Sequence, residues 1–315
     1  SNEILYADCY PVYLGLRVEI VLFHLAMESV CFSVLMSVYA GTRAADLHVC
    51  LLSIKEQTLT PDEIILIKDG PVDSALDKCI AAFTKSLPIR AHAYPVNRGL
   101  GNALRDGLLI CKNELVARVD SDDRCLPDRF SQQISFMIDN PEISVVGGFM
   151  RELYESRGQI ISAVRQVPVD PKTIISSAKK RNPINHPTVM FRKKVVIDCG
   201  NYQNCPYFED YFLWARLLES GCNLANLPVV LVETEIDSAY FERRGGINYI
   251  FDEVRLARKL YSIRFFSLIG VVWFLLIRLP VRLTPYRLRS SLYRYLLRTR
   301  RTIDHAAIVS ESEHN

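Results

Sequence analysis

VARVDSDD, residues 116–123, decides the fold: it is an apolar run that ends in the carboxylates of Asp120, Asp122 and Asp123. Burying this run as a strand of a parallel sheet brings the carboxylates to the strand's carboxyl end, where open α/β sheets bind ligands. Three acidic groups so close together repel one another unless a cation or a donor-rich ligand balances them. Oxygen ligands at this spacing suit Mg²⁺ or Mn²⁺ on a diphosphate. The alternative is a solvated acidic turn that caps a helix beginning near Pro127.

The composition indicates a globular protein with reduced thiols. The chain has 315 residues, 49% of them hydrophobic and 23% charged, which allows one large domain or two smaller ones. Its nine cysteines are an odd number without a C-x-x-C pair, which favours a cytosolic protein over a disulfide framework or a zinc site. Residues 10–26 are apolar but lack a basic leader and a cleavage site, so we expect no secretory signal.

The order of the expected elements predicts an α/β fold with a mostly parallel, Rossmann-like sheet flanked by helices. Apolar strand-like runs alternate with helical stretches between residues 32 and 150. The strands are expected at 32–39, 63–70, 89–94, 116–120 and 143–150, and the helices at 44–57, 73–85, 97–113 and 127–139. Later strands look shorter and antiparallel. Further helices are expected at 209–220 and 246–301.

Four polar features stand at the ends of these elements. In chain order they are Asp69, the turn Asn97-Arg98-Gly99, the acidic cluster at 120–123 and the pair Glu209-Asp210. An acidic pair at a helix start complements the helix dipole in any protein. A carboxylate held there beside a metal-diphosphate pocket is also what a general base needs.

This order of motifs resembles the family 2 glycosyltransferases of the GT-A fold. The resemblance covers about residues 32–221 in unbroken order. The matching stretches are SVLMSVYAG, EIILIKDGPVD, NRGLGNALRDGL, VARVDSDDRCLPDRF, NPINHPTVMFRKKVVIDCGNY and YFEDYFLWARLLESG. They look most like the bacterial exopolysaccharide subgroup that includes amylovoran- and colanic-acid-type transferases. One departure is Phe212, where the family often has an acidic residue.

The resemblance implies a donor site, a metal site and a base. It places seven residues at the nucleotide sugar: Val38, Tyr39, Asp69, Asn97, Arg98, Asp120 and His186. Asp122, with Asp123 as a second candidate, would ligate Mg²⁺ or Mn²⁺ on the diphosphate. Asp210 would be the general base, and Glu209 would orient it or the acceptor. For His186 a hydrogen-bonded turn histidine is the alternative, and for Arg98 a surface arginine.

The implied reaction is inverting transfer of a sugar from a nucleotide sugar, expected to be a UDP-sugar, to a glycan or lipid-linked oligosaccharide in exopolysaccharide or cell-surface polysaccharide biosynthesis. The metal stabilises the leaving diphosphate, and the base removes the acceptor's proton. One rival is a nucleotidyltransferase, which needs a glycine- and basic-rich loop after the first strand, and YAGTRAAD fits that poorly. The other rivals are a non-catalytic nucleotide-sugar-binding relative and a membrane-docked scaffold.

The carboxyl end is basic and apolar. From Arg255 to Arg301 there are twelve Lys or Arg and no Asp or Glu, and thirteen uncharged residues run from Phe265 to Ile277. That run is too short to span a bilayer but suits a segment lying on an anionic membrane surface. We expect one set of side chains at the headgroup boundary: Phe265, Phe266, Trp273 and Phe274, with Arg278, Arg282, Arg287 and Arg289 on anionic lipid.

Two alternatives remain for this segment. It could be a helix packed on the catalytic domain with a solvated tail, or a nucleic-acid-binding stretch, for which no motif speaks. We therefore predict an extension of unclear role (1–30), a GT-A domain (31–245) and a helical, basic, membrane-associating segment (246–315). The protein is expected in the cytoplasm, peripheral at the inner face of the plasma membrane, without a nucleic-acid partner.

Overall fold

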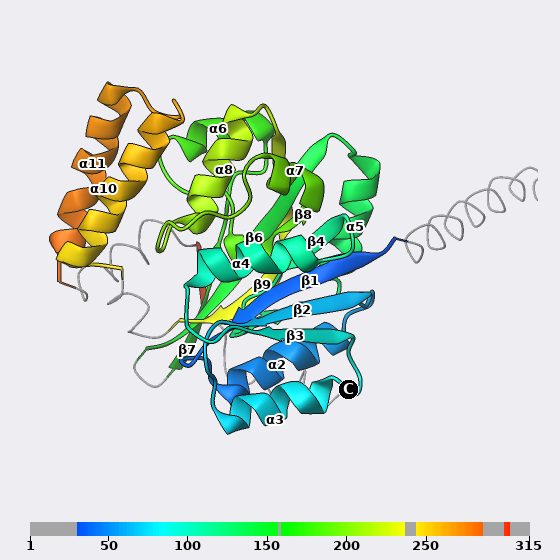
Figure 1. The fold of residues 1–315 in the computed structure, drawn as a ribbon. Coiled ribbons are helices and arrows are strands. Elements are labelled where there is room, and N and C mark those ends of the chain that lie inside the picture. The colour runs from blue at the N-terminus through cyan, green and yellow to red at the C-terminus, as the bar shows by residue number, and fades with distance from the viewer. Residues whose placement is uncertain (1–29, 157–158, 237–243, 286–298, 303–315) are drawn as a thin grey trace, which may run out of the picture.

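The computed structural model describes residues 30–156, 159–236, 244–285 and 299–302. In these residues helices cover both faces of one ten-stranded mixed sheet (Figure 1). The main path of the sheet runs β10-β7-β6-β8-β4-β1-β2-β3, and β9 pairs with β5 and β6. This is the α/β architecture that the alternation of strands and helices predicts.

The first half of the sheet is parallel. Its strands are β1 (Phe32–Val38), β2 (Glu63–Lys68), β3 (Ile89–Ala93) and β4 (Leu115–Arg118), and its helices are α2 (Ala44–Lys55), α3 (Ser74–Phe83) and α4 (Leu100–Ile110). Strand β1 lies between β2 and β4 and is parallel to both. Its apolar residues are buried on both faces, which is why the strand reads as a continuous hydrophobic run. The mostly parallel arrangement expected for residues 32–150 is confirmed for these four strands, whereas the strand expected at 143–150 pairs antiparallel with two neighbours and parallel with one.

Alternate residues of β1 enter two different cores. Phe32 and Val34 pack in the cluster that contains the apolar residues of α2 and α3, whereas Leu35 packs in the cluster that contains those of α4 and α8 (Glu209–Glu219). Helix α4 comes especially close to the sheet, since a Cβ on Gly107 would lie 2.5 Å from Leu35 Cδ1. The two cores fix the helices around the strand ends that form the site.

The second half is largely antiparallel, as expected. Its strands are β5 (Asp123–Cys125), β6 (Ile143–Ser156), β7 (Gln159–Arg165), β8 (Met190–Arg192) and β9 (Asn223–Glu235). The helical elements between them are α5 (Arg129–Asp139), α6 (Pro171–Ala178), the 3₁₀ turn η1 (His186–Thr188), α7 (Lys193–Asp198) and α8. Strand β8 lies antiparallel between β4 and β6, while β9 runs parallel to β6.

The expectation that 246–301 is helical throughout is wrong at its end. Helices α10 (Ile247–Ser262) and α11 (Leu268–Leu283) form as expected, but Thr299–Thr302 is a strand, β10. It pairs antiparallel with β7, bringing Thr302 opposite Ile161. An edge strand offers a row of backbone donors and acceptors. A segment that pairs with it satisfies its own backbone hydrogen bonds as a strand, even where its sequence favours a helix.

The lipid contacts expected for this segment are also largely wrong. Phe265, Phe266 and Phe274 are buried in a cluster with apolar residues of α8 and α10. Arg282 is nearly buried and Arg278 is only 18% exposed, and both form ion pairs with the fully buried Glu253. Burial works against the charged form of Glu253, but the two arginines outweigh it and lower its pKa. The segment therefore packs on the catalytic core, as its alternative interpretation held.

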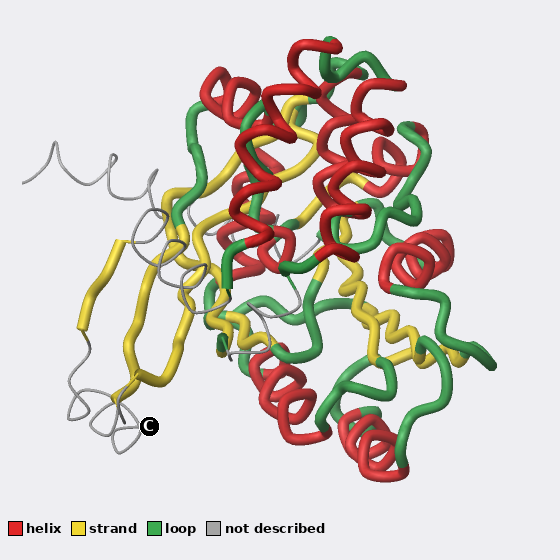
Figure 2. Tube along the Cα trace, turned by 90° about the vertical axis from the view of Figure 1, so that its left-hand side faces the viewer, coloured by secondary structure: helices red, strands yellow, loops and turns green. Residues whose placement is uncertain are grey.

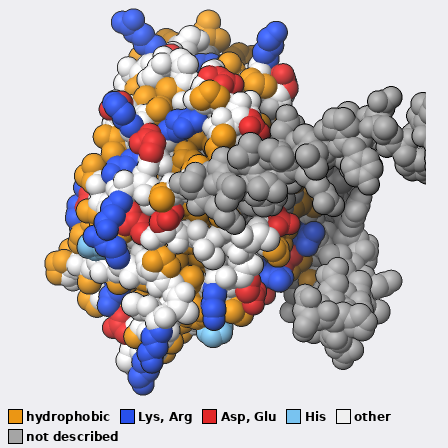
Figure 3. All heavy atoms as spheres, turned by 90° about the vertical axis from the view of Figure 1, so that its right-hand side faces the viewer, with side chains coloured by type: hydrophobic (Ala, Val, Ile, Leu, Met, Phe, Trp, Pro, Cys, Tyr) orange, Lys and Arg blue, Asp and Glu red, His pale blue; other side chains and the backbone are white. Residues whose placement is uncertain are grey.

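Trp273 does match its expectation, since it is 62% exposed on the outer face of α11. It belongs to a stripe of exposed apolar side chains, hereafter the α11 stripe: Leu268, Ile269, Val272, Trp273, Leu276 and Ile277. Figure 2 views the molecule from the side on which α10 and α11 stand. On the opposite side, seen in Figure 3, basic and acidic side chains are interspersed among the uncovered residues. Arg287 and Arg289 lie outside the described residues.

No helix in the part of the chain that the structure describes is long and apolar enough to cross a membrane. The domain boundaries expected at 30/31 and 245/246 stay predictions.

Candidate active site

The carboxyl ends of β1, β2 and β4 lie side by side and form the floor of the site. Val38 ends β1, and its carbonyl accepts a hydrogen bond from the Asp69 amide, just past β2, at 2.8 Å. Val119, just past β4, donates to the Leu35 carbonyl of β1 at 3.0 Å. Tyr39 follows Val38 and is half exposed. The expected donor residues Val38, Tyr39 and Asp69 are thus brought together by strand pairing.

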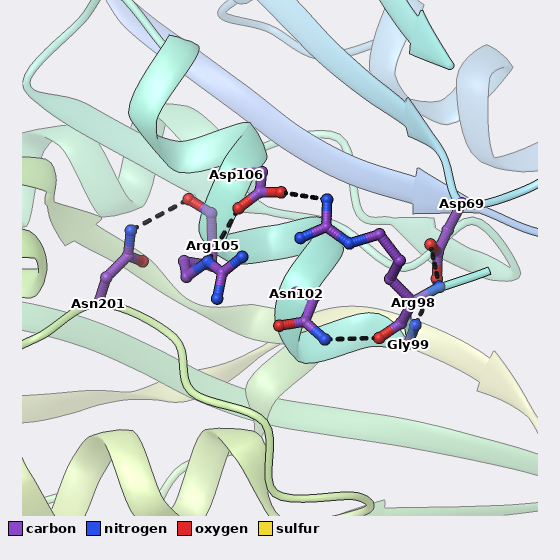
Figure 4. A network of polar contacts seen from close by, with 7 residues as sticks. All are labelled: Asp69, Arg98, Gly99, Asn102, Arg105, Asp106 and Asn201. Carbon is purple, nitrogen blue, oxygen red and sulfur yellow. Dashed lines mark hydrogen bonds and ion pairs between the residues drawn. The ribbon is translucent and has the colours of Figure 1, made fainter. Parts of the chain in front are cut away.

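Asp69 organises the turn that begins α4. Its carboxylate accepts the backbone N–H groups of Arg98 and Gly99 at 2.8 and 2.9 Å (Figure 4). The Asn97 side-chain amide donates back to the Asp69 carbonyl at 3.1 Å. Gly70 is required beside this turn, because its φ is +91° and a Cβ there would lie 2.8 Å from the Asn97 nitrogen. A role of Asp69 and Asn97 in binding the donor stays a prediction. Their hydrogen bonds already hold both residues in place.

The Arg98 side chain lies along α4. Its guanidinium forms an ion pair with Asp106 at 2.9 Å and stands 5.1 Å from the centre of the Tyr94 ring. Arg105 shares the same Asp106 carboxylate (Figure 4). The arrangement is that of a surface arginine, and a contact between Arg98 and a phosphate, which stays a prediction, would have to share or replace this pair.

Arg118, the last residue of β4, is a member of the site that the sequence analysis missed. Its side chain is only 2% exposed and binds Asp120 with both terminal nitrogens, one of them at 2.6 Å from Oδ2. A buried guanidinium is stable only with such a partner. The protein itself therefore balances one of the three clustered carboxylates. The signal was visible in VARVDSDD as a basic residue two positions before the first acid, inside an otherwise apolar strand.

Asp122 and Asp123 face different surroundings. Asp122 is exposed, yet packing around its carboxyl group and the nearby charge of Asp120 raise its pKa to about 6. Asp123 opens β5 and is 4% exposed, and its Oδ2 has no hydrogen-bond partner among the described residues. Burial and the charges of Asp120 and Asp122 raise the pKa of Asp123 as well. Both carboxyl groups are destabilised as anions, which a bound cation would reverse.

These carboxylates fit a divalent cation that is held mainly by a diphosphate. Such an ion needs only one or two protein carboxylates, because phosphate oxygens and water complete its shell. In the described residues no group of three or more His, Cys, Asp or Glu side chains is placed to hold a metal ion. Asp122, with Asp123 as second candidate, would supply the protein ligands.

The alternative in which the cluster caps a helix is not what the structure contains. Strand β5 separates the cluster from α5, which begins at Arg129. The N-cap of α5 is Asp128, and its side chain makes no capping hydrogen bond.

Glu209 and Asp210 open helix α8. The Asp210 carboxylate accepts from the Asn182 side-chain amide and from the Tyr211 backbone amide, both at 2.6 Å. Burial raises the pKa of Asp210, and these two hydrogen bonds oppose that rise. Burial and the charge of Asp210 raise the pKa of Glu209 to about 7. Asn182 is a second residue that the sequence analysis did not single out, although it begins the NPINHP motif that carried the resemblance.

The charge of Arg118 reaches both acidic groups. Its positive charge lowers the pKa of Glu209 and of Asp210, and the charge of Asp120 also reaches Glu209. The acidic turn after β4 and the acidic start of α8 are therefore both within reach of the charge of Arg118, although Asp123 and Glu209 are 86 positions apart in the chain. That the two acidic groups form one catalytic site stays a prediction.

His186 is a buried side chain in the 3₁₀ turn η1. Its Nε2 shares a hydrogen bond with the Tyr202 hydroxyl at 2.9 Å, and its ring meets the edge of Trp214. Burial and the charge of Arg118 hold the pKa of His186 well below its usual range. The arrangement is that of a hydrogen-bonded turn histidine, and contact with a diphosphate or metal stays a prediction.

A mixed sheet with an acidic turn at its strand ends and an acidic helix start is the arrangement expected for a GT-A glycosyltransferase. The chain belongs to glycosyl transferase family 2, whose sequence pattern matches residues 33–200. The amylovoran biosynthesis glycosyltransferase AmsE of Erwinia amylovora is 39% identical over 262 residues, covering 83% of this chain and 97% of the relative. A UDP-Gal:alpha-D-GlcNAc-diphosphoundecaprenol beta-1,3-galactosyltransferase of Escherichia coli is 34% identical over 267 residues, covering 85% and 96%.

Solved structures show the same fold at low identity. Mannosyltransferase PcManGT from Pyrobaculum calidifontis, in complex with GDP-Man and Mn²⁺, aligns with a TM-score of 0.59 and 13% identity over 91% of this chain and 81% of its own. S. aureus TarS 1-349 in complex with UDP-GlcNAc aligns with a TM-score of 0.55 and 16% identity over 73% and 66%. The expected GT-A fold is confirmed.

The first prediction concerns the metal. Asp122→Ala removes the most exposed carboxylate of the cluster, so the gain in UDP affinity that Mn²⁺ provides should fall by at least about tenfold. Calorimetric titration of UDP with and without Mn²⁺ measures that gain directly. Asp128→Ala, an exposed acid beyond β5, is the matched control. An undiminished Mn²⁺ effect in Asp122→Ala would remove Asp122 from the metal site.

The second prediction concerns the charge state of Asp210. Asn182→Ala deletes a hydrogen bond that lowers the pKa of Asp210, so the pKa of Asp210 should rise further. A base works when it is deprotonated, so the acid limb of the pH–rate profile should move to higher pH. Asn102→Ala on α4 is the control, and Glu209→Gln separates the titration of the neighbouring carboxyl. An acid limb that stays in place in Asn182→Ala contradicts the assignment.

Proposed function

We propose that this chain transfers a sugar, with inversion, from a UDP-sugar to a hydroxyl of a lipid-linked glycan in exopolysaccharide or cell-surface polysaccharide biosynthesis. The observation that carries the proposal is that the charge of Arg118, which is paired with Asp120 in the acidic turn after β4, also acts on Glu209 and Asp210 at the start of α8. One acidic group lies on the donor side and one on the acceptor side. A reaction with a leaving group and a base on opposite sides of a sugar needs that division.

On the acceptor side, Asp210 is proposed to remove the proton of the attacking hydroxyl. Its two hydrogen bonds hold the carboxylate in one orientation, and its raised pKa makes it a stronger base than an ordinary aspartate. Glu209, with a pKa of about 7, carries a proton part of the time near neutral pH and can donate a hydrogen bond to the acceptor. With a single base opposite the leaving group, the displacement proceeds in one step and inverts the sugar carbon.

On the donor side, the strand ends are proposed to hold the nucleotide. Val38 and Tyr39 would contact the base and ribose, and Asp120 would reach the ribose from its ion pair with Arg118. Mg²⁺ or Mn²⁺ at Asp122 and Asp123 would supply Lewis-acid stabilisation of the leaving diphosphate.

The comparisons support the choice of donor and acceptor. The E. coli relative is named for UDP-Gal as donor and a diphosphoundecaprenol-linked sugar as acceptor, and AmsE for amylovoran biosynthesis. This chain aligns with nearly the whole length of both relatives. No contact or motif in the described residues favours the nucleotidyltransferase that was weighed as an alternative.

The third prediction tests the base. Asp210→Asn keeps the shape but cannot accept a proton, so sugar transfer should fall by at least about 10²-fold while donor affinity is kept. Release of UDP from a panel of UDP-sugars, with calorimetry of UDP binding, measures the two effects separately. The control is Asp198→Asn, on the exposed face of α7. Transfer near the wild-type rate would show that another group is the base.

The α11 stripe supports a peripheral position at the cytoplasmic face of the membrane, where a lipid-linked acceptor would be met. Three basic residues that follow α6 or precede α11 in the chain are exposed: Lys180, Arg181 and Arg264. Apolar side chains of this kind enter the headgroup boundary, and each nearby basic residue adds about 1 kcal/mol on an anionic surface.

The fourth prediction concerns this surface. The double variant Ile269→Asp, Leu276→Asp places two charges in the α11 stripe without touching the buried core, so flotation with anionic liposomes should drop sharply. The wild-type protein should float better with anionic than with neutral liposomes, and less well at high salt. Leu109→Asp, an exposed apolar position on α4, is the control. Equal flotation of the double variant and the wild type would exclude the stripe as the membrane contact.

A further inference from the structure

A cavity of about 620 Å³ lies between the end of α6 and the first turns of α11. Its apolar walls include Phe266, Trp273 and Ile277. Its basic rim is formed by Lys179, Lys180 and Arg278, and no acidic side chain is among the described residues that line it. The volume is in the range of small-molecule sites. The site already described does not use this cavity.

The rim carries an excess of positive charge. Lys179 is partly neutralised, because it lies 3.5 Å from Glu219 and over the Phe265 ring. Arg278 and Arg282 share a single carboxylate, that of Glu253, so this trio has a net charge of one positive unit. Lys180 is exposed and has no ion pair among the described residues. A ligand with at least one negative charge beside a long apolar group would therefore match the cavity.

The cavity adjoins the base side of the active site. Lys180 stands two residues before Asn182, whose side chain holds the Asp210 carboxylate at 2.6 Å. Phe274, a wall residue, contacts the ring of Tyr211, the neighbour of Asp210, and the Tyr211 hydroxyl donates to the Ala178 carbonyl at the end of α6. The donor residues, in contrast, lie at the ends of β1, β2 and β4. A ligand in the cavity would be on the acceptor side.

We propose that this cavity binds the lipid diphosphate of the acceptor, with Lys180 and Arg278 on the diphosphate and the apolar wall on the first part of the hydrocarbon chain. The inference rests on the proposed function and names the part of the acceptor that the protein recognises. The diphosphate supplies the negative charge that the rim lacks. The hydrocarbon chain of the ligand covers the side chains of Trp273 and Ile277, which are otherwise exposed. The rest of the chain would continue along the α11 stripe toward the membrane.

The fifth prediction uses Trp273 as the reporter. The chain has two tryptophans, and Trp214 is fully buried, so a ligand that covers the exposed Trp273 should shift the emission to shorter wavelength. Titration with farnesyl diphosphate should give a saturable shift, at least about tenfold tighter than with farnesol, which lacks the charge. Lys180→Glu should weaken farnesyl diphosphate binding by a similar factor, and Lys180→Ala by less. Lys172→Glu, an exposed lysine at the other end of α6, is the matched control.

Three results would overturn the inference. These are equal affinity for farnesol and farnesyl diphosphate, unchanged binding in Lys180→Glu with a native melting curve, and a shift with anionic phospholipid vesicles but none with farnesyl diphosphate. The last would leave the cavity as part of a plain membrane-docking face.

Transfer assays distinguish this inference from the proposed function. Lys180→Glu should raise the KM for a prenyl-diphosphate-linked sugar and leave the KM for the UDP-sugar unchanged. If the wild type transfers sugar and Lys180→Glu leaves the KM for the prenyl-diphosphate-linked sugar unchanged, the cavity site is refuted but the proposed function is not. Farnesyl diphosphate binding that Lys180→Glu abolishes, in a protein that transfers no sugar from any nucleotide donor, would support the cavity site and refute the proposed function.

Discussion

The buried ion pair between Arg118 and Asp120 is the interaction around which the site is built. A guanidinium that is 2% exposed costs several kcal/mol unless it is paired, so Arg118 and Asp120 hold each other at the end of β4. The same positive charge acts on Asp122, Glu209 and Asp210 and lowers the pKa of each, against the burial that raises it. Several carboxyl groups can therefore gather in one space before any ligand arrives.

The carboxyl groups differ in charge state because their neighbours differ. Burial and the negative charge of Asp120 raise the pKa of Asp122 to about 6. The charge of Arg118 and a hydrogen bond from the backbone amide of Asp122 offset this rise only in part. Glu209 is nearly buried beside Asp210, and its pKa rises to about 7. Asp210 receives two hydrogen bonds that favour its anion. The proposed division into a cation-binding donor side and a proton-accepting acceptor side rests on these surroundings rather than on residue type.

Helices α10 and α11 pack beside the proposed acceptor side. They pack on α8 through a separate apolar cluster, and Glu253 neutralises much of the charge that Arg278 and Arg282 bring into it. This packing leaves one apolar stripe outside and one cavity beside the end of α6. The start of α8, which carries Asp210, is thereby held between the sheet and the face that would meet a lipid.

The sequence by itself determined the parallel half of the sheet, the order of the motifs and the acidic groups at the strand and helix ends. Hydrophobic periodicity is a local property that the sequence displays directly. Ligands of open α/β sheets bind at the carboxyl ends of the strands, so the polar residues there could be singled out from the sequence. Only the tertiary structure decided that Arg118 balances Asp120, that Asn182 holds Asp210 and that Glu253 takes up Arg278 and Arg282. Each of the last two pairings joins residues more than twenty positions apart, and in all three cases burial, which no local pattern reports, decides whether a charge faces water or a partner.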